Sequence, residues 1–146
     1  MKYFLLYSFS LIVLNTTAQV ADVLITNGRI IDGTGNSWFY GDIAIKDGKI
    51  IKVGNASNYT AAKTIDAKQL IIAPGFIDVH THIEGEEFRN PTANNFILDG
   101  VTTVVTGNCG ASNVDIKYYL WQIDSLKPSI NVATLIGHND VRKAVM

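Results

Sequence analysis

The pattern of apolar and polar positions changes twice along the chain. Residues 3–14, YFLLYSFSLIVL, form an apolar run without a charge. Over residues 19–72, short apolar stretches alternate with polar ones and are separated by Asn-Gly and Asp-Gly pairs. From residue 73 onward, β-branched runs alternate with stretches of helical spacing. The three patterns predict a targeting segment, a small sheet domain and an α/β domain.

The first eighteen residues resemble a secretory signal peptide. Met1 and Lys2 give a weakly positive start, and the small residues Thr16 and Ala18 follow the apolar run at the spacing that a signal peptidase requires. The run is short for a membrane span. We therefore expect residues 1–18 to be removed and the protein to be exported, as a periplasmic or secreted protein without a stable membrane anchor. An N-terminal anchor or a buried strand is the alternative.

Residues 19–72 read as hairpins of a small antiparallel sheet. Asn27-Gly28 and Asp47-Gly48 each lie between apolar stretches. These two dipeptides are strong signals for two-residue hairpin turns, because both turn positions need a positive φ. The segment is interpreted as the N-terminal part of a small β-sandwich domain, and nothing in it suggests chemistry.

Residues 73–146 alternate between strand and helix patterns. FIDVHTH, VTTVVTG and INVATLIGH predict three strands, and the segments between the runs have helical spacing. Strands that alternate with helices indicate a parallel sheet. The near-continuous apolar run at 101–107 is typical of a strand covered on both faces. A (β/α)8 barrel needs about 250 residues, so this α/β region corresponds to three units of an incomplete barrel.

The composition excludes some partners. The net charge is -1 and 47% of the residues are hydrophobic, which gives no charge excess for binding nucleic acid or an anionic membrane surface. The sequence holds a single cysteine, Cys109, so an internal disulfide is impossible. In an exported protein such a cysteine is either a small buried hydrophobe or a ligand.

His80 and His82 are the first candidates for chemistry. They stand two residues apart at the end of a predicted strand, so they share one face and can converge on a metal ion. Asp78 lies two residues before them and is a candidate to orient one of them. The alternative is a pair of histidines that hydrogen-bond the loop.

Three further candidates lie at the same predicted rim of the sheet. Cys109 follows the next strand, and a thiolate is a good zinc ligand. His138 ends the third predicted strand and is interpreted as a substrate contact or, equally, as a surface histidine. Glu84, Glu86 and Glu87 follow the His-x-His and are candidates to hydrogen-bond a ligating histidine, but at least two of them are expected to form a solvated acidic loop.

Taken together, these motifs resemble the amidohydrolase superfamily. VLITNGRIIDGTG resembles its opening strands and APGFIDVHTH its first barrel strand with the metal-binding His-x-His. GVTTVVTGNCG and GHNDVRKAVM resemble the N-acyl-D-amino-acid deacylases, the D-aminoacylase group. Where those deacylases often carry paired aspartates after the His-x-His, this chain has Ile83 and Glu84.

The resemblance implies a zinc-dependent hydrolase of linear amide bonds that acts on small N-acylated amino acids. It assigns His80, His82 and Cys109 as ligands of one or two zinc ions, and it places a catalytic aspartate on strand eight, beyond Met146. The 146-residue chain is therefore expected to be an N-terminal fragment that is inactive alone. Alternatives are another amidohydrolase, such as a cyclic amidase or isoaspartyl dipeptidase, and a short exported protein that at most binds metal.

Overall fold

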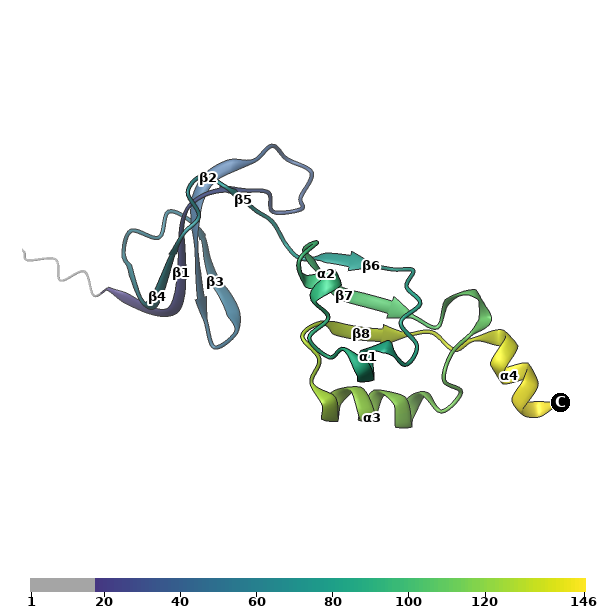
Figure 1. Ribbon diagram of the computed structural model, residues 1–146. Helices are drawn as coiled ribbons and strands as arrows, with labels where there is room; N and C mark the ends of the chain where they lie inside the picture. Colours follow the sequence, from purple (N-terminus) through teal and green to yellow (C-terminus); the bar gives the residue numbers. More distant parts are fainter. Residues whose placement is uncertain (1–17) are drawn as a thin grey trace, which may run out of the picture. The chain divides into compact units, whose positions relative to one another are not determined.

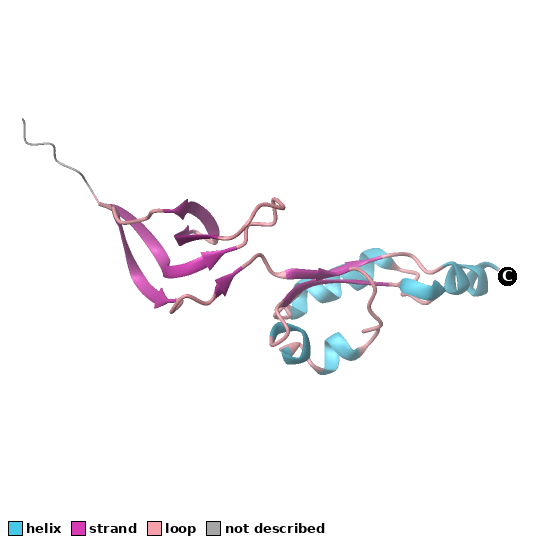
Figure 2. Ribbon diagram, turned by 90° about the horizontal axis from the view of Figure 1, so that it is seen from above, coloured by secondary structure: helices cyan, strands magenta, loops and turns pink. Residues whose placement is uncertain are grey.

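The computed structural model describes residues 18–146, so the predicted signal peptide lies almost entirely outside the described residues. The described chain divides after Ala73 into two compact units. The first contains strands alone, and the second combines strands with helices (Figure 2). No helix among the described residues is long and apolar enough to cross a membrane.

The first unit is one mixed five-stranded sheet. Its strands are β1 (Gln19–Ile30), β2 (Phe39–Lys46), β3 (Lys49–Gly54), β4 (Tyr59–Asp66) and β5 (Ile71–Ile72). Strands β3-β2-β1-β4 follow one another across the sheet, and β5 also pairs with β1 (Figure 1). Ala21, Leu24, Ala44 and Ala56 form its buried cluster.

One of the two predicted hairpins is present and the other is wrong. Asp47 and Gly48, with φ 49° and 70°, form the turn between the antiparallel strands β2 and β3. Asn27-Gly28 instead lies inside β1, where the pairing with β2 shifts by one residue between Ile25 and Gly28. The positive φ of Asn27, 58°, is used in this bulge. Because β4 and β5 run parallel to β1, the sheet is mixed rather than antiparallel.

The second unit is a three-stranded parallel sheet, in the order β6-β7-β8, with helices between its strands. Its elements are β6 (Phe76–Asp78), α1 (Glu86–Arg89), α2 (Asn94–Ile97), β7 (Val101–Thr106), the 3-10 turn η1 (Asn108–Gly110), α3 (Ile116–Leu126), β8 (Asn131–Thr134) and α4 (His138–Val145). The predicted alternation of strands and helices is confirmed. All three strands point the same way, so their carboxyl ends lie at one edge of the sheet (Figure 1).

The core of the second unit lies on one face of this sheet. Val104 of β7 packs with Ile83, Ala93 and Ile130, all of them buried. Val105, which alternates with Val104, is only partly buried, and Ile77 of β6 is 63% exposed. Within residues 18–146, therefore, the strands are covered on one face, whereas the sequence predicted that β7 would be covered on both.

Candidate metal centre

The candidate ligands lie on two loops that follow neighbouring parallel strands. The loop after β6 carries His80 and His82, and the loop after β7 carries Cys109. Asp78, the last residue of β6, accepts a hydrogen bond from the backbone N–H of His80 at 3.1 Å. Its contact is therefore with the backbone of His80, which fixes the direction in which the chain leaves the strand.

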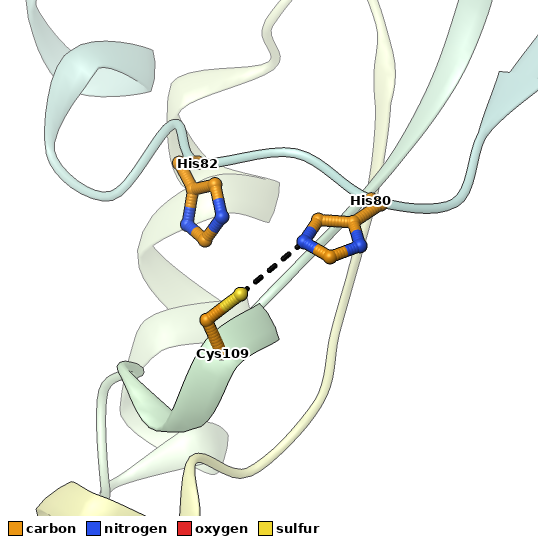
Figure 3. Close-up of side chains that lie close together, drawn as sticks. All are labelled: His80, His82 and Cys109. Carbon is orange, nitrogen blue, oxygen red and sulfur yellow. Dashed lines mark hydrogen bonds between the residues drawn. The ribbon is translucent and has the colours of Figure 1, made fainter.

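Thr81 fixes the side on which the two histidines emerge. Its backbone N–H and its hydroxyl both donate to the carbonyl of Val105, at 3.1 and 2.9 Å, and the residue is 5% exposed. Thr81 is thus anchored inward, whereas His80 and His82 on either side of it are both exposed. Their ring centroids lie 5.4 Å apart (Figure 3).

Cys109 is placed by a tight turn with three positive φ angles. Gly107, Cys109 and Gly110 have φ of 80°, 55° and 87°. A left-handed conformation costs a non-glycine residue about 1–2 kcal/mol, so Cys109 occupies it because the surrounding contacts hold it there. Asn108 supplies one of them, since its side-chain amide donates to the carbonyl of Val105 at 2.8 Å.

Gly107 allows this turn to approach the loop after β8. A Cβ at Gly107 would overlap the backbone of Leu135, which itself donates a hydrogen bond from its N–H to the carbonyl of Thr106 at 2.9 Å. Further along, the hydroxyl of Ser112 accepts from the N–H of Gly137 at 2.6 Å. The backbone of the loop after β8 therefore packs closely against the Cys109 turn.

The two loops bring His80, His82 and Cys109 together. Cys109 Sγ lies 3.4 Å from His80 Nε2, and one ligand atom from each of the three residues lies within 4.8 Å of the others (Figure 3). Around a tetrahedral zinc ion with bonds of 2.0–2.3 Å, neighbouring ligand atoms stand roughly 3.5 Å apart. Two imidazoles and one thiolate are also a donor set that zinc prefers. The three residues fit a zinc ion if the longer separations between their ligand atoms shorten to about 3.5 Å.

Glu84 is the acidic residue that joins the two loops. Its Oε1 accepts from the Thr106 hydroxyl at 2.7 Å and from the Gly107 N–H at 3.1 Å, and its Oε2 lies 4.0 Å from His82 Nδ1. Partial burial acts to raise the pKa of Glu84, but the hydrogen bonds from Thr106 and Gly107 outweigh it and lower the pKa below the ordinary value.

The other two glutamates have other partners. Glu86 forms an exposed ion pair with Arg89 at 2.6 Å. Glu87 is 6% exposed and packs beside Tyr119; burial, together with the carboxylate of Glu87, raises the pKa of the tyrosine above its usual range. Glu84 is therefore the one glutamate of the three that lies near a candidate ligand. Glu84 and Glu86 are exposed, as predicted for at least two of the three, whereas Glu87 is buried.

His138 is not part of the cluster. Strand β8 ends at Thr134, and His138 is the exposed first residue of α4 rather than the end of a strand. Its neighbours Gly137 and Asn139 approach Gly110, so the segment borders the Cys109 turn. Among residues 18–146, His80, His82 and Cys109 are the one group of this kind whose ligand atoms converge.

Three hollows in the described units include two that bear on function. One of about 380 Å³ lies beside His82 and is lined by Ile83, Glu87, Phe96 and neighbouring residues of α1 and α2. A larger one, of about 810 Å³, lies in the first unit. Its carboxylates Asp42 and Asp66 accept hydrogen bonds from backbone N–H groups of the same unit.

Sequence reasoning missed the residues that hold the ligands in place. Thr81, Thr106 and Asn108 act through contacts between the two loops, and no local pattern signals them. Gly107 and Gly110 could have been recognised, because glycines on either side of Asn108-Cys109 are typical of a turn with positive φ angles.

Two family profiles match the sequence. The profile described as "Amidohydrolase family" matches residues 63–146, and that of "Urease alpha-subunit, N-terminal domain" matches residues 9–78. The first includes both ligand-bearing loops and extends over more than half of the 146 residues.

Three relatives illustrate the range of similar proteins. N-acyl-D-aspartate deacylase of Alcaligenes xylosoxydans xylosoxydans is 34% identical over 86% of this chain and 30% of its own length. Adenine deaminase of Bacillus subtilis is 44% identical over 69% of this chain and 18% of its own. The solved N-acyl-D-glutamate deacylase of Bordetella bronchiseptica, complexed with zinc and a phosphonate inhibitor, is 35% identical with a TM-score of 0.83, over 88% of this chain and 32% of that one. The chain thus spans about a third of the length of these deacylases.

Proposed function

Because the chain belongs to the amidohydrolase family, we propose that it provides part of the metal site of a zinc-dependent N-acyl-D-amino-acid deacylase. The observation that carries the proposal is the convergence of His80, His82 and Cys109 within 4.8 Å at the carboxyl ends of two parallel strands. The zinc named with the solved N-acyl-D-glutamate deacylase supports the choice of metal.

The chain's own residues would hold the ion. His80 and His82 would bind it through neutral imidazole nitrogens, and Cys109 through its thiolate. When bound in such a site, zinc supplies Lewis-acid chemistry: it polarises an amide carbonyl and lowers the pKa of a bound water to about 7. The exposure of all three residues leaves the site open to substrate.

We further propose that the two units are parts of larger domains. The parallel sheet of the second unit would supply three units of a (β/α)8 barrel, and the first unit would be part of a small β-sandwich. The chain spans about a third of the length of these relatives, so we assign to it only the part of the site that its own residues form. In this proposal, residues 73–146 hold metal, and proton transfer belongs to the complete enzyme.

The proposed substrate is a small N-acylated amino acid. Relatives named for N-acyl-D-aspartate and N-acyl-D-glutamate support this class. The hollow of about 380 Å³ beside His82 has the size of a small-molecule site. His138 remains a proposed substrate contact, at the border of the Cys109 turn.

A second candidate is deamination of a nucleobase. The 44% identity with adenine deaminase over 69% of the chain favours it. The longer match with the deacylases and the TM-score of 0.83 favour deacylation. Hydrolysis of N-acetyl-D-aspartate, N-acetyl-D-glutamate and adenine, measured side by side on the complete protein from its source, would separate the two candidates.

The decisive test is the zinc content of Cys109→Ala. We expect the complete protein to contain zinc and the variant to lose most of it together with most hydrolysis, since the thiolate is one of three ligands in the cluster. His138→Ala is the matched control for zinc content, because His138 lies outside the cluster. Unchanged zinc in Cys109→Ala would contradict the ligand assignment. Zinc binding without hydrolysis of any of these substrates would favour a protein that only binds metal.

We also propose that the protein acts outside the cytoplasm, in the periplasm or after secretion. The support is the apolar run at residues 3–14, followed by Thr16 and Ala18. N-terminal sequencing of the mature protein tests it: a first residue of Gln19 supports export, and an intact Met1 contradicts it.

A further inference from the structure

The carboxylate of Glu84 lies between the two loops that carry the candidate ligands. One oxygen, Oε1, is held on the side of the Cys109 turn by the Thr106 hydroxyl at 2.7 Å and the Gly107 N–H at 3.1 Å. Thr106 is 1% exposed and Gly107 is buried. These two donors therefore fix Oε1 in one place.

The other oxygen faces a histidine. Oε2 lies 4.0 Å from His82 Nδ1, which is an ion-pair distance rather than a hydrogen bond. A carboxylate on this side favours the tautomer with the proton on Nδ1, which leaves Nε2 free to bind a metal. Ligating histidines commonly donate their second N–H to a carboxylate in this manner.

We propose that Glu84 is a positioning residue that locks the His82 loop to the Cys109 turn and selects the metal-binding tautomer of His82. The inference rests on the proposed zinc site and adds a residue that acts through the ligands without touching the ion. It follows from the two contacts of Glu84. Its carboxylate accepts from the N–H of Gly107, two positions before Cys109, and it also faces the ring of His82.

The other nearby glutamates cannot take this role. Glu86 is paired with Arg89 on the exposed face of α1. Glu87 is buried beside Tyr119, and no other carboxylate in the described chain lies within ion-pair distance of either cluster histidine. The arrangement therefore distinguishes Glu84 from residues of identical chemistry two and three positions away.

The test compares Glu84→Gln with the matched control Glu86→Gln in the complete, metal-free protein, using zinc alone as the probe. Gln retains an oxygen for Thr106 and Gly107 but presents an amide N–H to His82, which favours the wrong tautomer. Competition with a chelator should show zinc affinity weakened about 10–100-fold in Glu84→Gln, the range for removal of such a partner, and unchanged in Glu86→Gln. Thr106→Val keeps the carboxylate but removes one of its anchors, so its loss should be smaller.

Two further readouts separate positioning from general stability. The unfolding midpoint of the metal-free protein should fall only slightly in Glu84→Gln relative to Glu86→Gln, because the glutamine oxygen still accepts from Thr106 and Gly107. The absorption of the cobalt-substituted protein should change only in Glu84→Gln. Equal zinc affinity in these two variants overturns the inference and leaves the zinc site intact. A fall in metal-free stability that accounts for the weaker binding also overturns it. A wild-type protein that binds no zinc overturns the proposed function and this inference together.

Discussion

The two ligand-bearing loops place their side chains by opposite means. The loop after β6 bends at Val79 and His80 but has no positive φ before Gly85, and the inward anchor at Thr81 lies between the two exposed histidines. The loop after β7 departs from ordinary backbone, with a positive φ at Gly107, Cys109 and Gly110. The first arrangement needs one buried threonine and ordinary φ angles, whereas the second needs glycines at particular positions and close backbone contact. We therefore expect the Cys109 turn to tolerate substitution less well than the histidine loop.

The largest effect is expected from Gly107→Ala. The added methyl group meets the backbone of Leu135, which cannot move aside as a side chain would, and alanine also disfavours the φ of 80°. The two costs together predict a loss of about 2–5 kcal/mol in the free energy of unfolding, together with loss of zinc. Denaturant unfolding with and without zinc measures the free energy of unfolding and the stabilisation that zinc adds.

Gly33→Ala is the matched control for Gly107→Ala. Gly33 has a φ of 82°, but a Cβ there meets nothing within 4 Å. Its cost should be the conformational one alone, about 1–2 kcal/mol. If both variants lose the same stability, the contact with Leu135 does not constrain the Cys109 turn.

Thr81→Val should have an intermediate effect. It removes the hydroxyl bond to Val105 at 2.9 Å, but that carbonyl still accepts from the N–H of Thr81 and from the Asn108 amide. We expect a loss of about 1 kcal/mol in the free energy of unfolding and a modest fall in zinc affinity. Thr60→Val, on exposed β4, is the control. An effect of Thr81→Val as large as that of Gly107→Ala would remove the distinction between the loops.

The smallest effect concerns acid stability. The Ser112 backbone N–H donates to Asp140, and this bond, helped by one from Lys143, lowers the pKa of Asp140 below its ordinary value of 3.8. Because the pKa is lower in the folded state, the contribution is present above the unfolded value and is lost as the pH falls through the folded one. Asp140→Asn should therefore flatten the decline in the unfolding midpoint below about pH 4.

Labelling of the Cys109 thiol shows whether this contact acts on the turn. Asp32 has a pKa lowered in the same way by hydrogen bonds from Thr34, but it lies in the first unit, so Asp32→Asn is the control. Both variants should reduce the decline of the unfolding midpoint at low pH. Only Asp140→Asn should speed labelling of Cys109 in the metal-free protein. Equal labelling rates would show that Ser112 and Asp140 do not steady the Cys109 turn.

Much of the second unit could be predicted from the sequence because its signals are local. Alternation of β-branched runs with helical spacing predicts the parallel sheet, and parallel strands bring the loops after β6 and β7 to one edge. The proximity of Cys109 to the His-x-His follows from that arrangement. Their role as zinc ligands stays a prediction that Cys109→Ala tests.

The rest depends on contacts between segments far apart in the sequence. The Asn27-Gly28 signal was overridden because β1 continues through it to pair with β4 and β5, which come more than thirty residues later. Likewise, nothing local distinguishes Glu84 from Glu86 or Glu87; the distinction arises because Thr106 and Gly107 lie within reach of only one of them.

The exposure of Cys109 also makes its thiol accessible to oxidation during storage. A thiolate in solution is oxidised to sulfenic acid and then, irreversibly, to sulfinic and sulfonic acids. Residues 1–146 contain no second cysteine, so within this sequence the first product cannot be trapped as a disulfide. A coordinated ion would occupy the donor electrons of the sulfur and protect it from oxidation. Storage in a chelator would therefore allow irreversible oxidation of Cys109, and added zinc could not restore the site. In this chain the metal would act as a protecting group for its own ligand.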